Sequence, residues 1–209
     1  MIGLRLIDPI GVINRRVNKA ISQELNTRIS GNIGRARRRV KNIIPSWIMS
    51  QPEIASLLSQ CVPNTLNAEF GLPPGLADEA VNSIVSAVVR SIEVEFKKIS
   101  VDLKGGVIFR FQSSRFSNLL GLVDGHVIGD FGGDLHWLDW LLTKGDTTII
   151  KGYYYKPSSK GRSGGGTMDI GGSFRVDPSF SGTTENNFIT RAFKDRDGQL
   201  EDILSDLLR

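Results

Sequence analysis

The spacing of the apolar residues changes at Ile92, and this change restricts the fold more than any other feature of the chain. Before Ile92, apolar residues recur every three or four positions, as they do on one face of an α-helix. After Ile92 they alternate with charged residues, as they do in a strand with one buried face. Helical patterns followed by strand patterns predict an α+β fold, in which amphipathic helices pack on one face of a mostly antiparallel sheet.

The longest helical pattern covers residues 10–44 and carries most of the basic residues of the chain. Pro9 is tolerated in a first helical turn, and Pro45 is expected to end the helix because proline lacks an amide hydrogen. Further amphipathic patterns cover residues 76–90 and 200–208. We therefore expect a long basic N-terminal helix, shorter helices after it, and a helix at the C-terminal end.

The second part of the chain has several segments with strand composition. Residues 92–103 alternate and are followed by a Lys-Gly-Gly turn and the apolar residues 107–111, which predicts an antiparallel hairpin. Residues 147–155 are β-branched and aromatic, and shorter patterns cover 167–170 and 173–176. Together these segments predict one sheet of four or five strands.

A chain of 209 residues is long enough for one domain with a substantial core. We expect a single domain over residues 1–209, with a helical N-terminal region at 1–72 and an α+β core at 73–209. No run approaches the roughly 20 apolar residues of a membrane span. The first residues lack the order of charged, apolar and small residues found in signal peptides, so we expect synthesis in the cytoplasm.

Reactive side chains are few, which argues against an enzyme. The single cysteine, Cys61, excludes an intrachain disulfide, and its apolar helical surroundings predict a buried thiol. Neither His126 nor His136 has the spacing of a known metal motif. In the loop at 158–166 the lysine precedes the glycines, unlike a phosphate-binding loop. We therefore expect no catalytic, cofactor-binding or metal-binding residues. The acidic residues nearest to the two histidines are Asp124, Asp130, Asp134 and Asp139.

The net charge of +4 is unevenly distributed, because the first long helix contains a dense basic run. Three interpretations remain open: a solvated helix face, a contact with the phosphates of a nucleic acid, or a contact with an acidic partner. The aromatic residues of a single-strand stacking surface are missing from this run. The candidate contact residues are Arg35, Arg37, Arg38, Arg39 and Lys41.

A short segment at 137–142 is apolar on nearly all sides, so it requires cover on more than one face. A neighbouring subunit could supply part of that cover. The Gly/Ser-rich loop at 157–166 is predicted to be either a flexible surface loop or a loop that becomes ordered on contact with another subunit. These two segments predict a subunit interface, and its candidate residues are Trp137, Trp140, Leu141, Lys160, Arg162 and Ser163.

The segment from Leu135 to Phe193 contains several short motifs in a fixed order. They are Trp137-Leu138-Asp139-Trp140-Leu141-Leu142 with Gly145-Asp146, then Gly161-Arg162-Ser163-Gly164 with Met168, then Phe174-Arg175-Val176, Ser181-Gly182-Thr183 and Asn187-Phe188-Ile189-Thr190-Arg191-Ala192. With these motifs the chain resembles the neck or tail-completion proteins, also called head–tail joining proteins, of long-tailed bacteriophages.

The resemblance implies a structural virion protein with no catalytic activity and no cofactor. Such a subunit assembles with copies of itself into a ring, by resemblance a hexamer or a dodecamer, that joins the DNA-filled head to the tail. Its other partners would be virion proteins on the portal or adaptor side and on the tail side, and DNA would pass through the ring. The alternative is a small basic nucleic-acid-binding protein that uses the helix face from Arg35 to Lys41.

Overall fold

The computed structural model describes residues 8–111, 115–128 and 133–208. The chain divides into two compact units. Unit 1 contains the residues up to 42, residues 92–110, and the residues from 196 onward; unit 2 contains residues 43–91 and 111–195. The expectation of a single domain, with regions at 1–72 and 73–209, stays a prediction.

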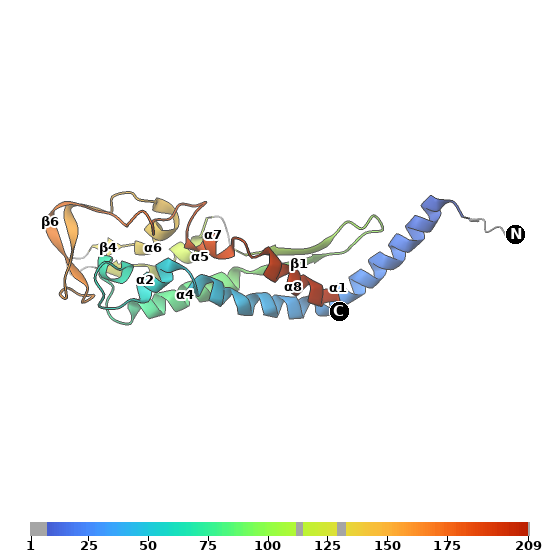
Figure 1. The fold of residues 1–209 in the computed structure, drawn as a ribbon, viewed down its shortest axis with the longest axis horizontal. Helices are drawn as coiled ribbons and strands as arrows, with labels where there is room; N and C mark the ends of the chain where they lie inside the picture. The colour runs from blue at the N-terminus through green and yellow to red at the C-terminus, as the bar shows by residue number, and fades with distance from the viewer. Residues whose placement is uncertain (1–7, 112–114, 129–132, 209) are drawn as a thin grey trace. The chain divides into compact units, whose positions relative to one another are not determined.

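Unit 1 is built along the first helix, α1 (Ile10–Met49), whose residues up to 42 belong to this unit. The C-terminal helix α8 (Asp197–Leu208) lies alongside α1 (Figure 1). An ion pair joins Arg39 to Asp206, and the side chain of Arg28 donates a hydrogen bond to the Leu208 carbonyl oxygen at 2.7 Å. The long N-terminal helix and the C-terminal helix are therefore confirmed.

The predicted hairpin is present in unit 1 as β1 (Glu93–Lys97) and β2 (Gly106–Arg110), which pair antiparallel. Its first strand is shorter than expected, because the chain leaves the ladder after Lys97. The main-chain amide and carbonyl of Ile99 bond instead to the side chain of Asn26 in α1, at 2.8 and 2.9 Å. This two-way amide contact replaces strand pairing and attaches the connection between the strands to the helix.

Unit 2 contains the end of α1, seven further short helical elements, one longer helix and two small β-ribbons among its described residues. The ribbons are β3 (Val127–Ile128) with β4 (Asp134–Leu135), and β5 (Ile150–Pro157) with β6 (Gly166–Phe174). The helical elements are α2 (Pro52–Leu58), α3 (Leu66–Glu69), α4 (Leu76–Ser91), α5 (Ser117–Leu120), the 3₁₀ turn η1 (Val123–Gly125), α6 (Trp137–Asp139), the π-helical turn η2 (Trp140–Lys144) and α7 (Phe188–Phe193).

The core of unit 2 collects apolar side chains from almost all of these helices. α4 contributes a buried face that follows its predicted amphipathic pattern. The aromatic rings of Trp47, Phe111 and Phe193 pack together, with the two phenylalanine centroids 4.8 Å apart. The largest fully buried side chains of this unit include Ile44, Ile48, Ile54, Leu57, Leu66, Leu72, Ile84, Phe116, Leu119, Trp137, Leu138 and Phe188.

The prediction that Pro45 ends the first helix is wrong, because α1 continues for one more turn to Met49. A proline inside a helix removes one hydrogen bond and destabilises the helix by about 3 kcal/mol. Here the turn that follows the proline buries Trp47 and Ile48 completely or nearly so, at 3% and 0% exposure. Burying two large apolar side chains yields about 3–6 kcal/mol, which offsets the loss.

The predicted sheet of four or five strands is also wrong, because the described strands form three separate two-stranded ribbons. The two short patterns at 167–170 and 173–176 belong largely to one strand, β6. Gly171 and Gly172, both with positive φ, carry that strand through the gap between the two patterns. The mixed helix and strand composition is confirmed, whereas one sheet covered by helices is not. Among the described residues, no helix has both the length and the apolar character that crossing a membrane requires.

Candidate functional site

The basic run from Arg35 to Lys41 lies on α1 within unit 1, but it does not form one basic face. Each residue turns about 100° around a helix axis, so seven consecutive residues extend all around the helix. The Arg37 guanidinium donates a hydrogen bond to the Val94 carbonyl oxygen of β1 at 3.1 Å, and Arg39 pairs with Asp206 of α8. Two of the five candidate contact residues therefore hold unit 1 together.

The other three cations of this run have different surroundings. Lys41 and Arg37 line a groove of about 550 Å³ that also contains Glu93, Glu95 and Arg110, so both signs of charge are present there. Within the described chain, Arg35 and Arg38 are exposed and have no hydrogen-bond or ion-pair partner. Of the five candidate contact residues, only these two have guanidinium groups that no described residue engages, so they are free to bind an external anion.

The N-terminal part of α1 exposes several apolar side chains of the helical pattern at 10–44. Ile10, Val17 and Ile21 are 70%, 49% and 41% exposed. Together with the half-buried Ile13 they form what we term the α1 stripe. In Figure 1 this part of the helix extends past the end of α8. The stripe is therefore an apolar surface on a helix that unit 1 does not cover.

The spacing of the stripe matches one seam of a coiled coil. Ile10, Ile13 and Val17 of the stripe follow steps of three and four, and Ala20 continues this spacing, so these four residues occupy the a and d positions of two heptads. Ile21, the last residue of the stripe, lies beside this seam at an e position. Farther along the helix the apolar residues recur in steps of four, and each such step turns the apolar face by about 40°. For this reason the face that is buried at Ile29, Ala36 and Val40 is not the face that carries the stripe.

The predicted interface helix at 137–142 lies in the core of its own unit. Trp137 and Leu141 are both 0% exposed, and Trp140 is half-buried. The indole ring of Trp137 packs on Phe70 of unit 2 with centroids 5.8 Å apart. The cover that this apolar segment requires thus comes from the same chain. The role of Trp137, Trp140 and Leu141 in a subunit interface stays a prediction, with no structural feature in its support.

The loop between β5 and β6 is folded against α3 of the same unit, contrary to the expectation of a flexible loop. Arg162 donates hydrogen bonds to the carbonyl oxygens of Gly71 and Ile128, at 2.6 and 2.8 Å. Ser163 is buried and donates to the Ala68 carbonyl oxygen at 3.4 Å. An added Cβ at Gly165 would lie 2.4 Å from the Ala68 Cβ, so this close approach requires glycine. Of the three predicted interface residues in this loop, only Lys160 is exposed with a side chain that has no hydrogen-bond or ion-pair partner among the described residues.

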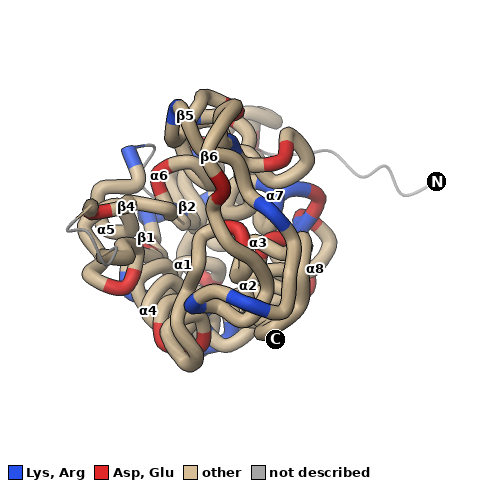
Figure 2. The backbone as a smooth tube through the Cα atoms, turned by 90° about the vertical axis from the view of Figure 1, so that its left-hand side faces the viewer, with Lys and Arg blue, Asp and Glu red and all other residues tan. Residues whose placement is uncertain are grey.

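The β5–β6 ribbon is a second surface with exposed apolar side chains. Tyr153 and its cross-strand partner Ile170 lie on one face, and Tyr154 lies on the other. Ile170 is 86% exposed. Figure 2 shows both acidic and basic residues around this ribbon. Lys156 and Asp169, from its two strands, form an ion pair at 2.8 Å. A two-stranded ribbon exposed on both faces is marginally stable by itself, so it is suited to contact another surface.

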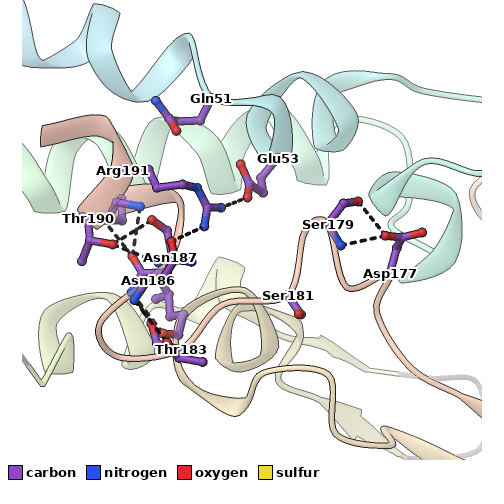
Figure 3. Close-up of polar contacts among 12 residues, drawn as sticks. Gln51, Glu53, Asp177, Ser179, Ser181, Thr183, Asn186, Asn187, Thr190 and Arg191 are labelled. Atoms are coloured by element: carbon purple, nitrogen blue, oxygen red, sulfur yellow. Dashed lines mark hydrogen bonds and ion pairs between the residues drawn. The ribbon is translucent and has the colours of Figure 1, made fainter. Parts of the chain in front are cut away.

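A buried polar centre joins α7 to the π-helical turn η2 (Figure 3). Asn187 is fully buried and caps α7, accepting hydrogen bonds from the amides of Ile189 and Thr190. Its side-chain amide donates to the Leu142 and Thr183 carbonyl oxygens, at 3.1 and 2.8 Å. The motif from Asn187 to Ala192, which contributes to the resemblance, therefore stabilises the fold of unit 2.

The same motif contains a buried ion pair between Arg191 of α7 and Glu53 of α2. The Glu53 side chain is 0% exposed, and its Oε2 has no hydrogen-bond partner among the described residues. Burial raises the pKa of this carboxyl, while its own main-chain amide and the Arg191 guanidinium act in the opposite direction. Arg191 also donates a hydrogen bond to the Asn186 side chain at 2.9 Å.

A second carboxyl with a shifted pKa is Glu69 at the end of α3. Burial, together with the negative charge of Asp177, raises the pKa of Glu69 to about 7. Two hydrogen bonds from Ser179 lower the pKa of Asp177, which therefore keeps its charge (Figure 3). Glu69, Asp177 and Tyr154 line a cleft of about 350 Å³. Near neutral pH, Asp177 is therefore ionised, whereas Glu69 is ionised only in part.

The two histidines lie together in unit 2, on either side of Asp134. His126 Nδ1 is 3.4 Å and His136 Nε2 is 3.1 Å from Asp134 Oδ2. Of the other nearby acids, Asp124 binds the Ser83 hydroxyl, Asp139 is not in this cluster, and Asp130 lies outside the described residues. The sequence spacing gave no motif for this cluster, because a two-stranded pairing brings its members together.

Cys61 differs from the expectation of a buried thiol. The residue is exposed and has a positive φ of 57°, because it lies in the turn after α2 and not on an apolar helix face.

Comparisons with protein-family models, with curated proteins and with solved structures found no match to this chain.

Proposed function

We propose that this chain is a structural virion protein of a tailed bacteriophage. In this role it is a neck, head–tail connection or tail-completion subunit, and copies of it form a ring that joins the DNA-filled head to the tail. The order of motifs from Leu135 to Phe193 suggests the class of protein. The observation that carries the proposal of assembly is the exposed α1 stripe.

The occupant that best fits the α1 stripe is the same stripe of a second copy. Helices with apolar residues at a and d positions pack against similar helices. In this register Arg15 and Lys19 occupy outer positions, away from the seam, and Arg16 forms an ion pair with Asp8 at 2.6 Å. Two stripes can therefore approach without bringing like charges together. Homo-oligomers with closed symmetry use such repeated contacts.

The size of the contact can be stated for Val17, which is about half exposed in the single chain. Covering it fully contributes about 1 kcal/mol per copy, half the value for a completely buried valine. A contact between two copies includes two such residues, so Val17→Gln should weaken it by about 2 kcal/mol. This change corresponds to a roughly 30-fold rise in the dissociation constant.

The matched control is Val12→Gln. Val12 is 40% exposed and lies in the same part of α1, but about 140° around the helix from Val17. The mass of the native protein in solution, measured across concentrations, gives the oligomeric state of each variant. We expect an oligomer for the wild type and Val12→Gln, and dissociation for Val17→Gln. A protein that is monomeric throughout, or equal behaviour of both variants, would contradict assembly through the stripe.

Electron microscopy of the purified oligomer tests the ring itself. We expect closed rings with a central opening wide enough for a DNA duplex to pass. An open filament or a simple dimer would leave self-association without the proposed neck role.

The second candidate function is binding of a nucleic acid, and one observation favours it. Arg35 and Arg38 are exposed and have no partner within the described chain. Two phosphate contacts give a salt dependence with a slope of about −2 in log affinity against log salt. The double variant Arg35→Gln/Arg38→Gln should remove this slope, whereas the control Arg90→Gln, exposed in the other unit, should not. Absence of duplex binding at low salt would exclude this candidate.

A further inference from the structure

The donor atoms of His126, Asp134 and His136 converge on one point of unit 2. His126 directly precedes β3, Asp134 lies in β4, and His136 is the residue before α6. The antiparallel pairing of Ile128 with Asp134 brings the start of β3 near the end of β4. One potential ligand atom from each of the three side chains lies within 4.8 Å of the other two.

The separations between these atoms match those around a small metal ion. Zinc binds histidine nitrogen and carboxylate oxygen at about 2.0–2.2 Å in tetrahedral geometry, so its ligand atoms are about 3.3–3.5 Å apart. The two histidine nitrogens lie 3.4 and 3.1 Å from Asp134 Oδ2. The imidazole rings are 3.8 Å apart at their centroids. Both rings thus approach the same carboxylate oxygen from neighbouring directions.

We propose that His126 Nδ1, Asp134 Oδ2 and His136 Nε2 bind a divalent transition-metal ion of the zinc class. Two imidazole nitrogens and one carboxylate oxygen suit Zn²⁺, Co²⁺ or Ni²⁺, whereas Mg²⁺ and Ca²⁺ prefer sites made only of oxygen. All three side chains are partly exposed, so water can fill the fourth position and the ion can exchange with solvent.

The ion would act as a clamp between the small β3–β4 ribbon and the helix that follows it. His136 precedes Trp137 and Leu138, both of which are buried in the core of unit 2. A metal bond at His136 therefore ties a ribbon with only two residues in each strand to a helix that the core already holds. This inference does not depend on the proposed virion function, since it concerns the stability of a single chain.

The test uses the full chain, purified without a polyhistidine tag, and Zn²⁺ as the probe. The chain has only two histidines, so the ring resonances of His126 and His136 can be followed by NMR during a Zn²⁺ titration. We expect both to shift at one equivalent of Zn²⁺, and the midpoint of thermal unfolding to rise with Zn²⁺ concentration. Co²⁺ should give the visible absorption of a four-coordinate site.

Asp134→Asn keeps the shape of the side chain but removes its charge, and it should weaken Zn²⁺ binding by at least 10-fold. The matched control is Asp139→Asn, because this acid lies near the cluster in sequence but outside it. His136→Gln should weaken binding further. The proposal would be overturned if the histidine resonances do not shift, or if Asp134→Asn binds Zn²⁺ as tightly as Asp139→Asn. Loss of structure in a variant without metal is detected by circular dichroism, and the wild-type NMR titration then decides alone.

Discussion

The ion pair between Arg191 and Glu53 gives the sharpest test of how unit 2 is stabilised. Arg191→Met retains much of the side-chain volume but removes the charge. Glu53, which is 0% exposed, is then left without its cationic partner. An unpaired buried carboxylate is strongly unfavourable, and breaking such pairs typically destabilises a protein by 3–5 kcal/mol.

The structure sets an upper limit on this loss, because the carboxyl can take up a proton. At pH 7, protonating a glutamate whose ordinary pKa is 4.5 costs about 3.4 kcal/mol, at 1.36 kcal/mol per pH unit. At pH 5 the same step costs only about 0.7 kcal/mol. The wild-type pKa of Glu53 is itself raised, so the difference between variant and wild type should be about 2–3 kcal/mol at pH 7 and below about 1 kcal/mol at pH 5.

The direction of this pH dependence follows from proton linkage. In the Arg191→Met variant the folded chain holds a proton on Glu53 that the unfolded chain releases above its ordinary pKa. The free energy of unfolding of the variant therefore falls as pH rises from about 4.5 toward 7. Below pH 4.5 both states hold the proton, and the variant loses little relative to the wild type.

The assay is urea unfolding at pH 5 and pH 7, followed by tryptophan fluorescence. All three tryptophans, Trp47, Trp137 and Trp140, belong to unit 2, so the signal reports the unit that contains the ion pair. The control is Arg175→Met, which removes an exposed 3.7 Å pair with Asp146 and should change the free energy of unfolding by less than about 1 kcal/mol. An equal loss at both pH values for Arg191→Met would show that packing, and not the buried charge, is responsible.

Two further predictions concern stability in other parts of the chain. Glu69→Gln should leave the free energy of unfolding nearly unchanged at pH 5 and raise it by about 1–2 kcal/mol at pH 8. The reason is that the pKa of Glu69 is raised to about 7 in the folded wild type, which therefore loses stability as pH rises from 4.5 through 7. Urea unfolding at the two pH values measures this, and a difference independent of pH would contradict it. Gly165→Ala should lower the midpoint of thermal unfolding, because the added methyl group would overlap Ala68 and overpacking costs about 1–3 kcal/mol. The matched change Gly34→Ala, in an open helical position of α1, should raise the midpoint of thermal unfolding. If calorimetry shows that both variants shift this midpoint in the same direction, the packing argument is refuted.

Local patterns predicted local structure well, because spacing along one segment determines which face can be buried. The spacing of three and four predicted the helix at 76–90, and the alternation after Ile92 predicted the hairpin of β1 and β2. The sequence did not predict the number of sheets. Alternation shows that a segment can be a strand, but it does not identify the partner strand, and three separate ribbons have the same pattern as one sheet.

The structure gives no support to the predicted subunit interface at 137–142, and the reason is related. An apolar segment such as 137–142 requires cover, but its sequence does not say whether the same chain or a second copy provides it. The basic run from Arg35 to Lys41 shows the same limit. Its composition predicts a charged surface, whereas the structure shows Arg37 and Arg39 engaged by a carbonyl oxygen and a carboxylate of unit 1.

The residues behind the phage resemblance and the residues proposed for assembly perform different physical tasks. Asn187 and Arg191, within the matching motifs, are engaged inside unit 2, where a change would disturb the fold. The α1 stripe lies outside the matching segment, and its exposed side chains can change without disturbing a core. A protein that assembles with particular copies and neighbours needs this separation, because its contacts must be adjustable while its fold stays fixed. Substitutions in the stripe should therefore alter assembly at nearly constant stability, whereas substitutions in the motifs should alter stability first.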